Sequence, residues 1–180
     1  MSQSLEFTDQ ADQEPKKEIL DDNARKFIVN SLDPGFLKEN NATSFIMTTD
    51  WLETGEDNEK KLAYKKFENG DIQIVLIAKS TKNGNRTSEK EMINEAQYAS
   101  LLEKSVRRLE KRRYELTYIQ NKTEFTLKYD EFANSQLRIL EVDAPTEDER
   151  NSFNAQSFPA VLSEVTGDLR YYGYRVADTV

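Results

Sequence analysis

The sequence contains no cysteine and no histidine. Without cysteine there can be no disulfide, thiolate nucleophile, zinc–thiolate site or iron–sulfur cluster. Without histidine the commonest general base and transition-metal ligand is missing, and with it every Ser-His or Cys-His mechanism. Any chemistry must therefore use carboxylates, Lys, Arg, Tyr, hydroxyl groups or a hard metal ion held by oxygen ligands.

Long apolar runs are missing as well. The run over 74–78 is typical of the longest, whereas a membrane-spanning helix needs about 20 apolar residues. The N-terminus has no basic region followed by an apolar stretch, which predicts that there is no signal peptide. We therefore expect a soluble, cytoplasmic protein that does not bind membranes, and the lack of cysteine fits a reducing compartment.

The net charge of −8 is spread unevenly along the 180 residues. Residues 1–22 hold seven acidic and two basic residues without hydrophobic periodicity, which predicts a disordered acidic tail before one folded domain over 23–180. The segment 104–113 holds six basic residues and one acid. It is a solvated face, a strip for nucleic acid or one wall of an anion pocket. The acidic character of the whole chain argues against binding of duplex nucleic acid.

Eight segments have the alternation or the β-branched and aromatic content of strands. They are 25–30, 44–52, 60–67, 72–79, 86–93, 105–116, 124–130 and 136–143. The Asn-Gly pairs at 69–70 and 83–84 suit tight antiparallel hairpins. Capping boxes that begin at Asn94 and Thr146 predict two helices, and a third is expected over 168–177. Because strands and helices do not alternate regularly, the predicted class is α+β with a mainly antiparallel sheet.

The alternation of side chains along two of these strands predicts a charged interior. Lys111 and Arg113 share one face of their strand, and Glu141 and Asp143 share one face of theirs. The strand over 105–116 is charged on both faces, unlike a strand that covers an ordinary core. Bases and acids directed into one lumen fit an anion bound with a divalent cation. The alternative is a set of exposed cross-strand ion pairs.

Five segments in one order resemble the motifs of a known family. They are DNARKFIV at 22–29, LIAKS at 76–80, EKRRY at 110–114, LEVD at 140–143 and EVTGDLRY at 164–171. Over residues 22–177 the chain is similar to the CYTH family, or triphosphate tunnel metalloenzymes, which includes inorganic triphosphatases, thiamine triphosphatases and class IV adenylyl cyclases. The resemblance implies an eight-stranded antiparallel β tunnel with flanking helices that binds a triphosphate with Mg²⁺ or Mn²⁺.

The resemblance also implies roles for particular residues. The phosphate-binding residues would be Lys26, Lys65, Lys79, Lys111, Arg113 and Arg170. Lys26, Glu141 and Asp143 would be catalytic, and Glu141 and Asp143 would hold the metal ion. Glu89 and Glu91 would join them if a one-residue gap aligns the strand over 86–93 with the family pattern. An ungapped match instead places Ser88 and Lys90 at these acidic positions, and the sequence leaves both alignments open.

Two further acids of the family pattern are replaced, one by Ala24 and one by Lys128. The predicted function is therefore binding of a triphosphate, a polyphosphate or a nucleoside triphosphate, with metal-dependent hydrolysis if the site is active. The alternative is a catalytically degenerate tunnel that senses a phosphate ligand or docks a protein. A role in RNA binding rests on the basic strip alone, and homodimerisation is left open.

Overall fold

The computed structural model describes residues 18–179, which form one ten-stranded sheet with short helices around it. The strands are β1 (Glu18–Asp21), β2 (Arg25–Val29), β3 (Thr43–Glu53), β4 (Asn58–Phe67), β5 (Ile72–Lys82), β6 (Asn85–Met92), β7 (Arg107–Gln120), β8 (Thr123–Phe132), β9 (Arg138–Asp143) and β10 (Val161–Glu164). The helices are α1 (Pro34–Glu39), α2 (Glu95–Leu102), α3 (Glu147–Asn151), α4 (Gly173–Val176) and the 3₁₀ helices η1 (Ala155–Ser157) and η2 (Leu169–Tyr171).

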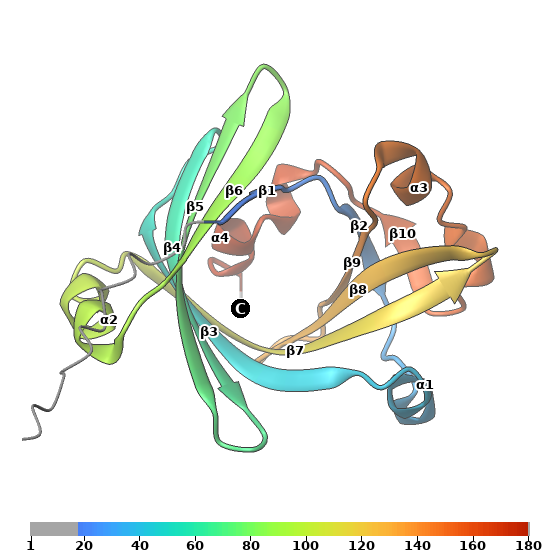
Figure 1. Ribbon diagram of the computed structural model, residues 1–180, viewed down its shortest axis with the longest axis horizontal. Coiled ribbons are helices and arrows are strands. Elements are labelled where there is room, and N and C mark those ends of the chain that lie inside the picture. The colour runs from blue at the N-terminus through green and yellow to red at the C-terminus, as the bar shows by residue number, and fades with distance from the viewer. Residues whose placement is uncertain (1–17, 180) are drawn as a thin grey trace, which may run out of the picture.

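The strand order is β1-β6-β5-β4-β3-β7-β8-β9-β2-β10, with antiparallel pairing throughout. The sheet forms a curved wall with two halves (Figure 1). Strands β3 to β6 form one half, and β7, β8, β9 and β2 form the other. Tight turns join neighbours as the Asn-Gly pairs predict. In the β5–β6 turn, Asn83 and Gly84 both have positive φ, at 51° and 78°, which fits the primed turns that match strand twist.

The chain itself connects the two halves of the wall. β1 pairs with β6 near one end of the sheet, while β2 lies between β9 and β10 near the other end. Residues 22–24 alone separate β1 from β2. The sheet therefore curls into a tunnel-like shape although its hydrogen-bonded order stays open (Figure 1).

The largest apolar core lies on the outer face of the wall, not in its interior. Phe27, Phe125, Leu127 and Leu140 of β2, β8 and β9 are fully buried there. Phe153 packs on Phe27 and Phe125 at ring distances of 5.7 and 5.3 Å. Segments around α1 and α3 cover this face, and α4 lies on the inner side (Figure 1). The outer face thus carries the largest share of the apolar burial, while the inner face combines charged side chains with two smaller apolar clusters.

All eight predicted strands are confirmed, and so are the capping boxes of α2 and α3. The predicted count of eight was too low, because β1 and β10 extend the sheet. β1 also shows that the end of the predicted disordered tail is a strand, while residues 1–17 lie outside the described part. The single helix expected over 168–177 is instead η2 and α4, separated at Tyr172, where the backbone is extended.

Helix α1 was not predicted, because Asp33-Pro34-Gly35 has the composition of a turn. Asp33 is its N-cap and accepts a hydrogen bond from the Phe36 amide, and Pro34 occupies the first helical turn. Both are ordinary features of a helix start. Among residues 18–179, no helix is both long and apolar enough to cross a bilayer.

Candidate functional site: the charged lumen

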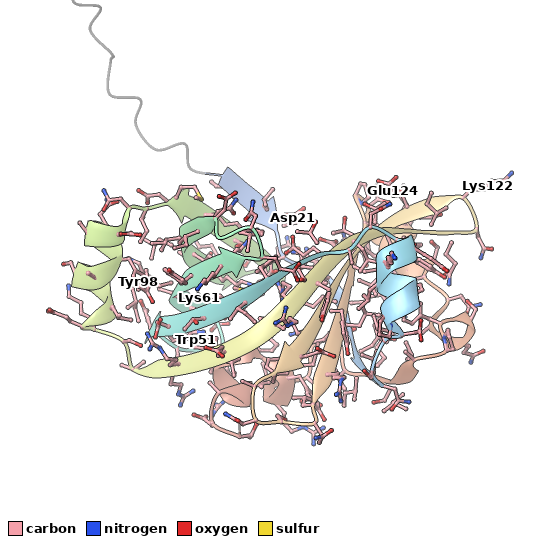
Figure 2. The ribbon with its side chains drawn as sticks, turned by 90° about the horizontal axis from the view of Figure 1, so that it is seen from below. Asp21, Trp51, Lys61, Tyr98, Lys122 and Glu124 are labelled. Carbon is pink, nitrogen blue, oxygen red and sulfur yellow. The ribbon has the colours of Figure 1, made fainter. Side chains whose placement is uncertain are left out.

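One face of the curved sheet collects the basic side chains of many strands. Met47 of β3 pairs with Lys65 of β4 and with Lys111 of β7, so both lysines project from the same face. Extending this alternation through the register gives the lumen bases Lys26, Lys61, Lys65, Lys79, Arg86, Lys90, Arg107, Lys111, Arg113 and Lys128. Lys61 lies beside Trp51 of the neighbouring strand, with its ammonium 5.5 Å from the ring centre (Figure 2).

A buried ion-pair network forms the centre of the β7–β9 half. Asp130 accepts hydrogen bonds from Nε and Nη2 of Arg113 at 2.6 and 2.7 Å and from Lys111 Nζ at 2.6 Å. Glu141 lies 3.5 Å from Arg113 Nη2. Burial would raise the pKa values of both acids, but Arg113 and the neighbouring lysines outweigh it and lower them. Both carboxylates are therefore charged at neutral pH.

A second network joins β1, β4 and β6. Glu59 is 4% exposed, bonds to Lys61, and accepts from Trp51 Nε1 at 2.9 Å and Arg86 Nη2 at 3.0 Å. Burial would raise the pKa of Glu59, but the nearby lysines lower it to about 2. Asp22, just beyond β1, accepts from Lys79 Nζ at 2.6 Å and Arg86 Nε at 3.2 Å.

The crowding of charges lowers the pKa values of two lysines in the lumen. Burial, together with the positive charge of Lys79, lowers the pKa of Lys61 to about 8. Burial and the positive charge of Arg113 lower the pKa of Lys111 to about 8 as well. In each case the acidic partner does not fully compensate for desolvation and like charge. Positive charge in the lumen therefore exceeds what its carboxylates neutralise.

Three lumen lysines have no carboxylate within 4 Å in the described part of the chain: Lys26, Lys65 and Lys128. Lys26 Nζ donates to the Tyr171 carbonyl at 3.1 Å. Burial lowers the pKa of Lys65; the charge of Glu115 raises it, while Arg113, Lys90 and Lys128 lower it further. Since β6 and β8 lie on opposite sides of β4 in the sheet order, positive charge from both sides acts on Lys65.

The C-terminal segment closes one end of the lumen. Tyr174 and Val176 are buried against Trp51, Leu109 and other apolar side chains of the inner face. Tyr172 places its ring 5.0 Å from the Arg86 guanidinium and 5.5 Å from the Lys26 ammonium. A Cβ on Gly173 would lie 2.9 Å from the Trp51 ring, so glycine is required there.

The opposite end of the strands borders a hollow of about 510 Å³, lined by Thr43, Glu115, Thr117 and Thr126 among others. Glu115 is also the acid whose charge acts on Lys65. The hollow thus lies at the end of the strands away from α4, beside the end of α1.

All but one of the predicted phosphate-binding residues lie on the lumen face of the sheet. Lys26, Lys65, Lys79, Lys111 and Arg113 lie on it. Arg170 lies in η2, where its largely exposed guanidinium forms a bidentate pair with Asp168. The structure therefore does not bring Arg170 into the cluster.

The four acids predicted to hold a metal ion do not come together. Glu89 and Glu91 pair with Ala78 and Leu76, which places them on the outer face, while Ser88 and Lys90 face the lumen. This corrects the gapped alignment and removes Glu89 and Glu91 from any site with Glu141. Asp143, at the end of β9, lies 3.7 Å from Arg150 of α3 instead. No group of three or more carboxylates in residues 18–179 is arranged to hold a metal ion.

The residues present therefore do not fit a resident Mg²⁺ or Mn²⁺. These ions need several oxygen ligands that are free to coordinate. Of the lumen carboxylates, Asp130 and Glu59 each bond to two fixed cations, and Glu141 lies among four bases that lower its pKa. Carboxylate oxygens that already neutralise a lysine or an arginine are poor ligands for an additional divalent cation.

Sequence reasoning missed four members of the lumen networks: Glu59, Lys61, Arg86 and Asp130. Asp130 could have been found, since it stands two residues after Lys128 and so on the same face of one strand. Lys61 shares a face with Lys65 in the same way. Glu59 and Arg86 stand two residues before Lys61 and Ser88, so alternation gives their face as well, but their pairing with each other depends on how β4 and β6 are brought together.

The fold and the site together define a class of protein: an antiparallel β tunnel whose sheet is not closed by hydrogen bonds and whose lumen is charged. No protein-family model and no curated protein matches the sequence. Two crystal structures of NE1496 are similar to this chain at 24% identity, with TM-scores of 0.57 and 0.58. They cover 88% of this chain and 97% and 99% of theirs, and one is described as an inorganic triphosphatase.

A third similar structure is that of the PH1819 protein from Pyrococcus horikoshii OT3, at 19% identity and a TM-score of 0.50. The similarity covers 71% of this chain and 82% of that one. These likenesses show the fold: the chain has a CYTH-like antiparallel tunnel architecture. The resemblance found in the sequence motifs is thus confirmed at the level of the fold.

Proposed function

We propose that the lumen binds an inorganic triphosphate, a longer polyphosphate or the triphosphate group of a nucleotide. The observation that carries this proposal is that Lys65, Lys128 and Arg113 project from the same face of the curved sheet, with no carboxylate within 4 Å of either lysine in the described part of the chain. Ammonium and guanidinium groups form strong charge-assisted hydrogen bonds with phosphate oxygens. A ligand with several linked phosphates would reach bases on several strands at once.

The low pKa values of Lys61 and Lys111, both about 8, support the same proposal. Crowded positive charge destabilises the empty lumen, and a polyanion would relieve that repulsion when it binds. The geometry is thus organised to favour a multiply charged anion over water.

The first test is stabilisation by inorganic tripolyphosphate. A ligand that binds the native state alone raises the melting temperature, by an amount that grows with its concentration. We expect a clear rise with tripolyphosphate and a smaller one with orthophosphate, which reaches fewer bases. No rise with tripolyphosphate, longer polyphosphate or ATP would reject the proposal and favour a protein-docking role.

Binding should weaken as the pH rises from 7 to 9. A bound anion favours the protonated forms of Lys61 and Lys111, so it raises their pKa values and binding takes up protons. Above their free pKa of about 8 this uptake costs affinity. Titration calorimetry at several pH values measures the slope.

The matched control for this pH dependence is Lys111→Arg, because arginine keeps its charge throughout this range. Its affinity should decline less steeply than that of the wild type, while titration of the ligand itself affects both equally. An identical slope in the two proteins would contradict the assignment of the pH effect to the lumen lysines.

Hydrolysis of a phosphoanhydride bond is a second candidate, since a similar structure is that of an inorganic triphosphatase. The test is release of orthophosphate from tripolyphosphate and ATP with added Mg²⁺ or Mn²⁺. Release that Glu141→Ala abolishes, with the fold intact, would support an enzyme. Binding without release above that variant would leave the sensing role.

A further inference from the structure

Three carboxylates of the lumen are neutralised by fixed side chains of the protein. Asp130 accepts from both Lys111 and Arg113, and Glu59 bonds to both Lys61 and Arg86. Asp22, outside these two pairs, lies between Lys79 and Arg86. In each case the oxygens that a divalent cation would need already accept hydrogen bonds from a cationic group.

Glu141 has no close bidentate partner, yet four bases act on it. Arg113 lies 3.5 Å from it, and Lys26 and Lys128 are its direct neighbours in the register of β9 with β2 and β8. A divalent cation bound at Glu141 would be repelled by all three bases, and the repulsion is strong where water is scarce. The position beside Glu141 therefore favours an anion.

Lys128 occupies a central place in this arrangement. Its register partners are Glu115 on β7 and Glu141 on β9, and its charge acts on Glu141 and on Lys65, while no carboxylate lies within 4 Å of it among the described residues. In a metal-dependent phosphate site a bridging metal ion supplies the positive charge between carboxylates and phosphate. Here the protein supplies that cation itself.

A buried hydroxyl on the same face provides a further donor. Ser88 Oγ is buried and has no hydrogen-bond partner within the described residues. Ser88 pairs with Lys79 of β5 and precedes Lys90 by two positions, so it lies between two lumen bases. An unpaired buried hydroxyl is costly unless a ligand satisfies it, and a phosphate oxygen accepts from a hydroxyl readily.

We propose that this tunnel binds polyphosphate without a divalent metal ion, with Lys65 and Lys128 supplying the charge that a metal ion would otherwise supply. The inference rests on the proposed function, because it concerns the same lumen and the same ligand class. It differs in assigning the counter-charge to side chains of β4 and β8 and not to Mg²⁺ or Mn²⁺.

The experiment is titration calorimetry of the full chain with inorganic tripolyphosphate, once with excess EDTA and once with excess Mg²⁺. Binding should be as tight or tighter with EDTA, because Mg²⁺ in solution neutralises part of the charge on the ligand. Affinity raised tenfold or more by Mg²⁺, or binding found with Mg²⁺ alone, would overturn the inference and leave the proposed function standing. Absence of binding under both conditions would instead reject the proposed function.

Two variants and a matched control test the assigned residues under the EDTA condition. Lys65→Ala and Lys128→Ala should each weaken tripolyphosphate binding about tenfold or more, as expected for loss of a hydrogen bond between charged groups. Lys66→Ala, the exposed neighbour that projects from the opposite face, should leave the affinity within about twofold. Equal affinities for all three variants, with unchanged melting temperatures, would overturn the assignment.

Discussion

Replacing Arg113 by alanine should lower the free energy of unfolding by about 3–5 kcal/mol, the range seen when one partner of a buried ion pair is removed. Arg113 forms two hydrogen bonds to Asp130 and approaches Glu141, and all three side chains are buried or partly buried. The variant leaves Asp130 with Lys111 as its one cationic partner among the described residues. Urea unfolding at pH 7 measures the loss.

The neighbouring residue Arg112 provides the control. Its side chain projects to the outer face, is 40% exposed and lies 3.8 Å from Glu68. Exposed pairs of this kind contribute about 0–1 kcal/mol, so Arg112→Ala should change stability little. Similar losses in the two variants would show that the Asp130 network does not stabilise the fold.

The difference between wild type and Arg113→Ala should also shrink in acid. Arg113 lowers the folded-state pKa values of Asp130 and Glu141, so the stability that these acids contribute is present above their unfolded pKa values and is lost as the pH falls through the folded ones. The variant has less of this contribution to lose. A difference that stays constant from pH 7 down to pH 3 would contradict the electrostatic origin of the effect.

Replacing Trp51 by alanine should cost about 3–5 kcal/mol as well, through a different mechanism, the loss of a large buried side chain. Trp51 is 1% exposed and packs on Leu109 and Tyr174. Its indole N–H also donates to Glu59, which would lose one of its partners. Thermal or urea unfolding checks the loss of stability, and faster proteolysis near α4 would report release of the C-terminal segment.

Two controls separate packing from hydrogen bonding at Trp51. Ile119→Ala removes a large side chain that is 67% exposed, so it should change stability by less than about 0.5 kcal/mol. Trp51→Phe keeps an aromatic ring but loses the N–H, and should fall between wild type and Trp51→Ala. A near-neutral Trp51→Ala would mean that α4 is not anchored through this ring.

The strands and two of the helices could be predicted because their signals are local. Alternation, Asn-Gly turns and the capping boxes at Asn94 and Thr146 act within a few residues, and the structure has each of them. The same locality explains why α1 was missed, since Asp33-Pro34-Gly35 starts a turn and a helix equally well. β1 was missed because a short acidic strand has no pattern of its own and exists through its pairing with β6.

In the lumen, too, local alternation predicted some features and strand pairing decided others. Alternation alone placed Lys111 with Arg113, and the register confirms that they share a face. It could not decide between Glu89 with Glu91 and Ser88 with Lys90, because a shift of one residue exchanges the two faces of a strand. The pairing of β6 with β5 made that choice.

By itself, the sequence determined the antiparallel strands, the absence of thiol and imidazole chemistry, and the alternation that directs Lys111 and Arg113 to one side. The tertiary structure alone decided which acid each base meets: Asp130 with Arg113, Glu59 with Lys61, and none with Lys65 or Lys128 among the described residues. The physical reason is that the face of a side chain follows from local backbone geometry, while its partner depends on the curvature that brings distant strands across the lumen.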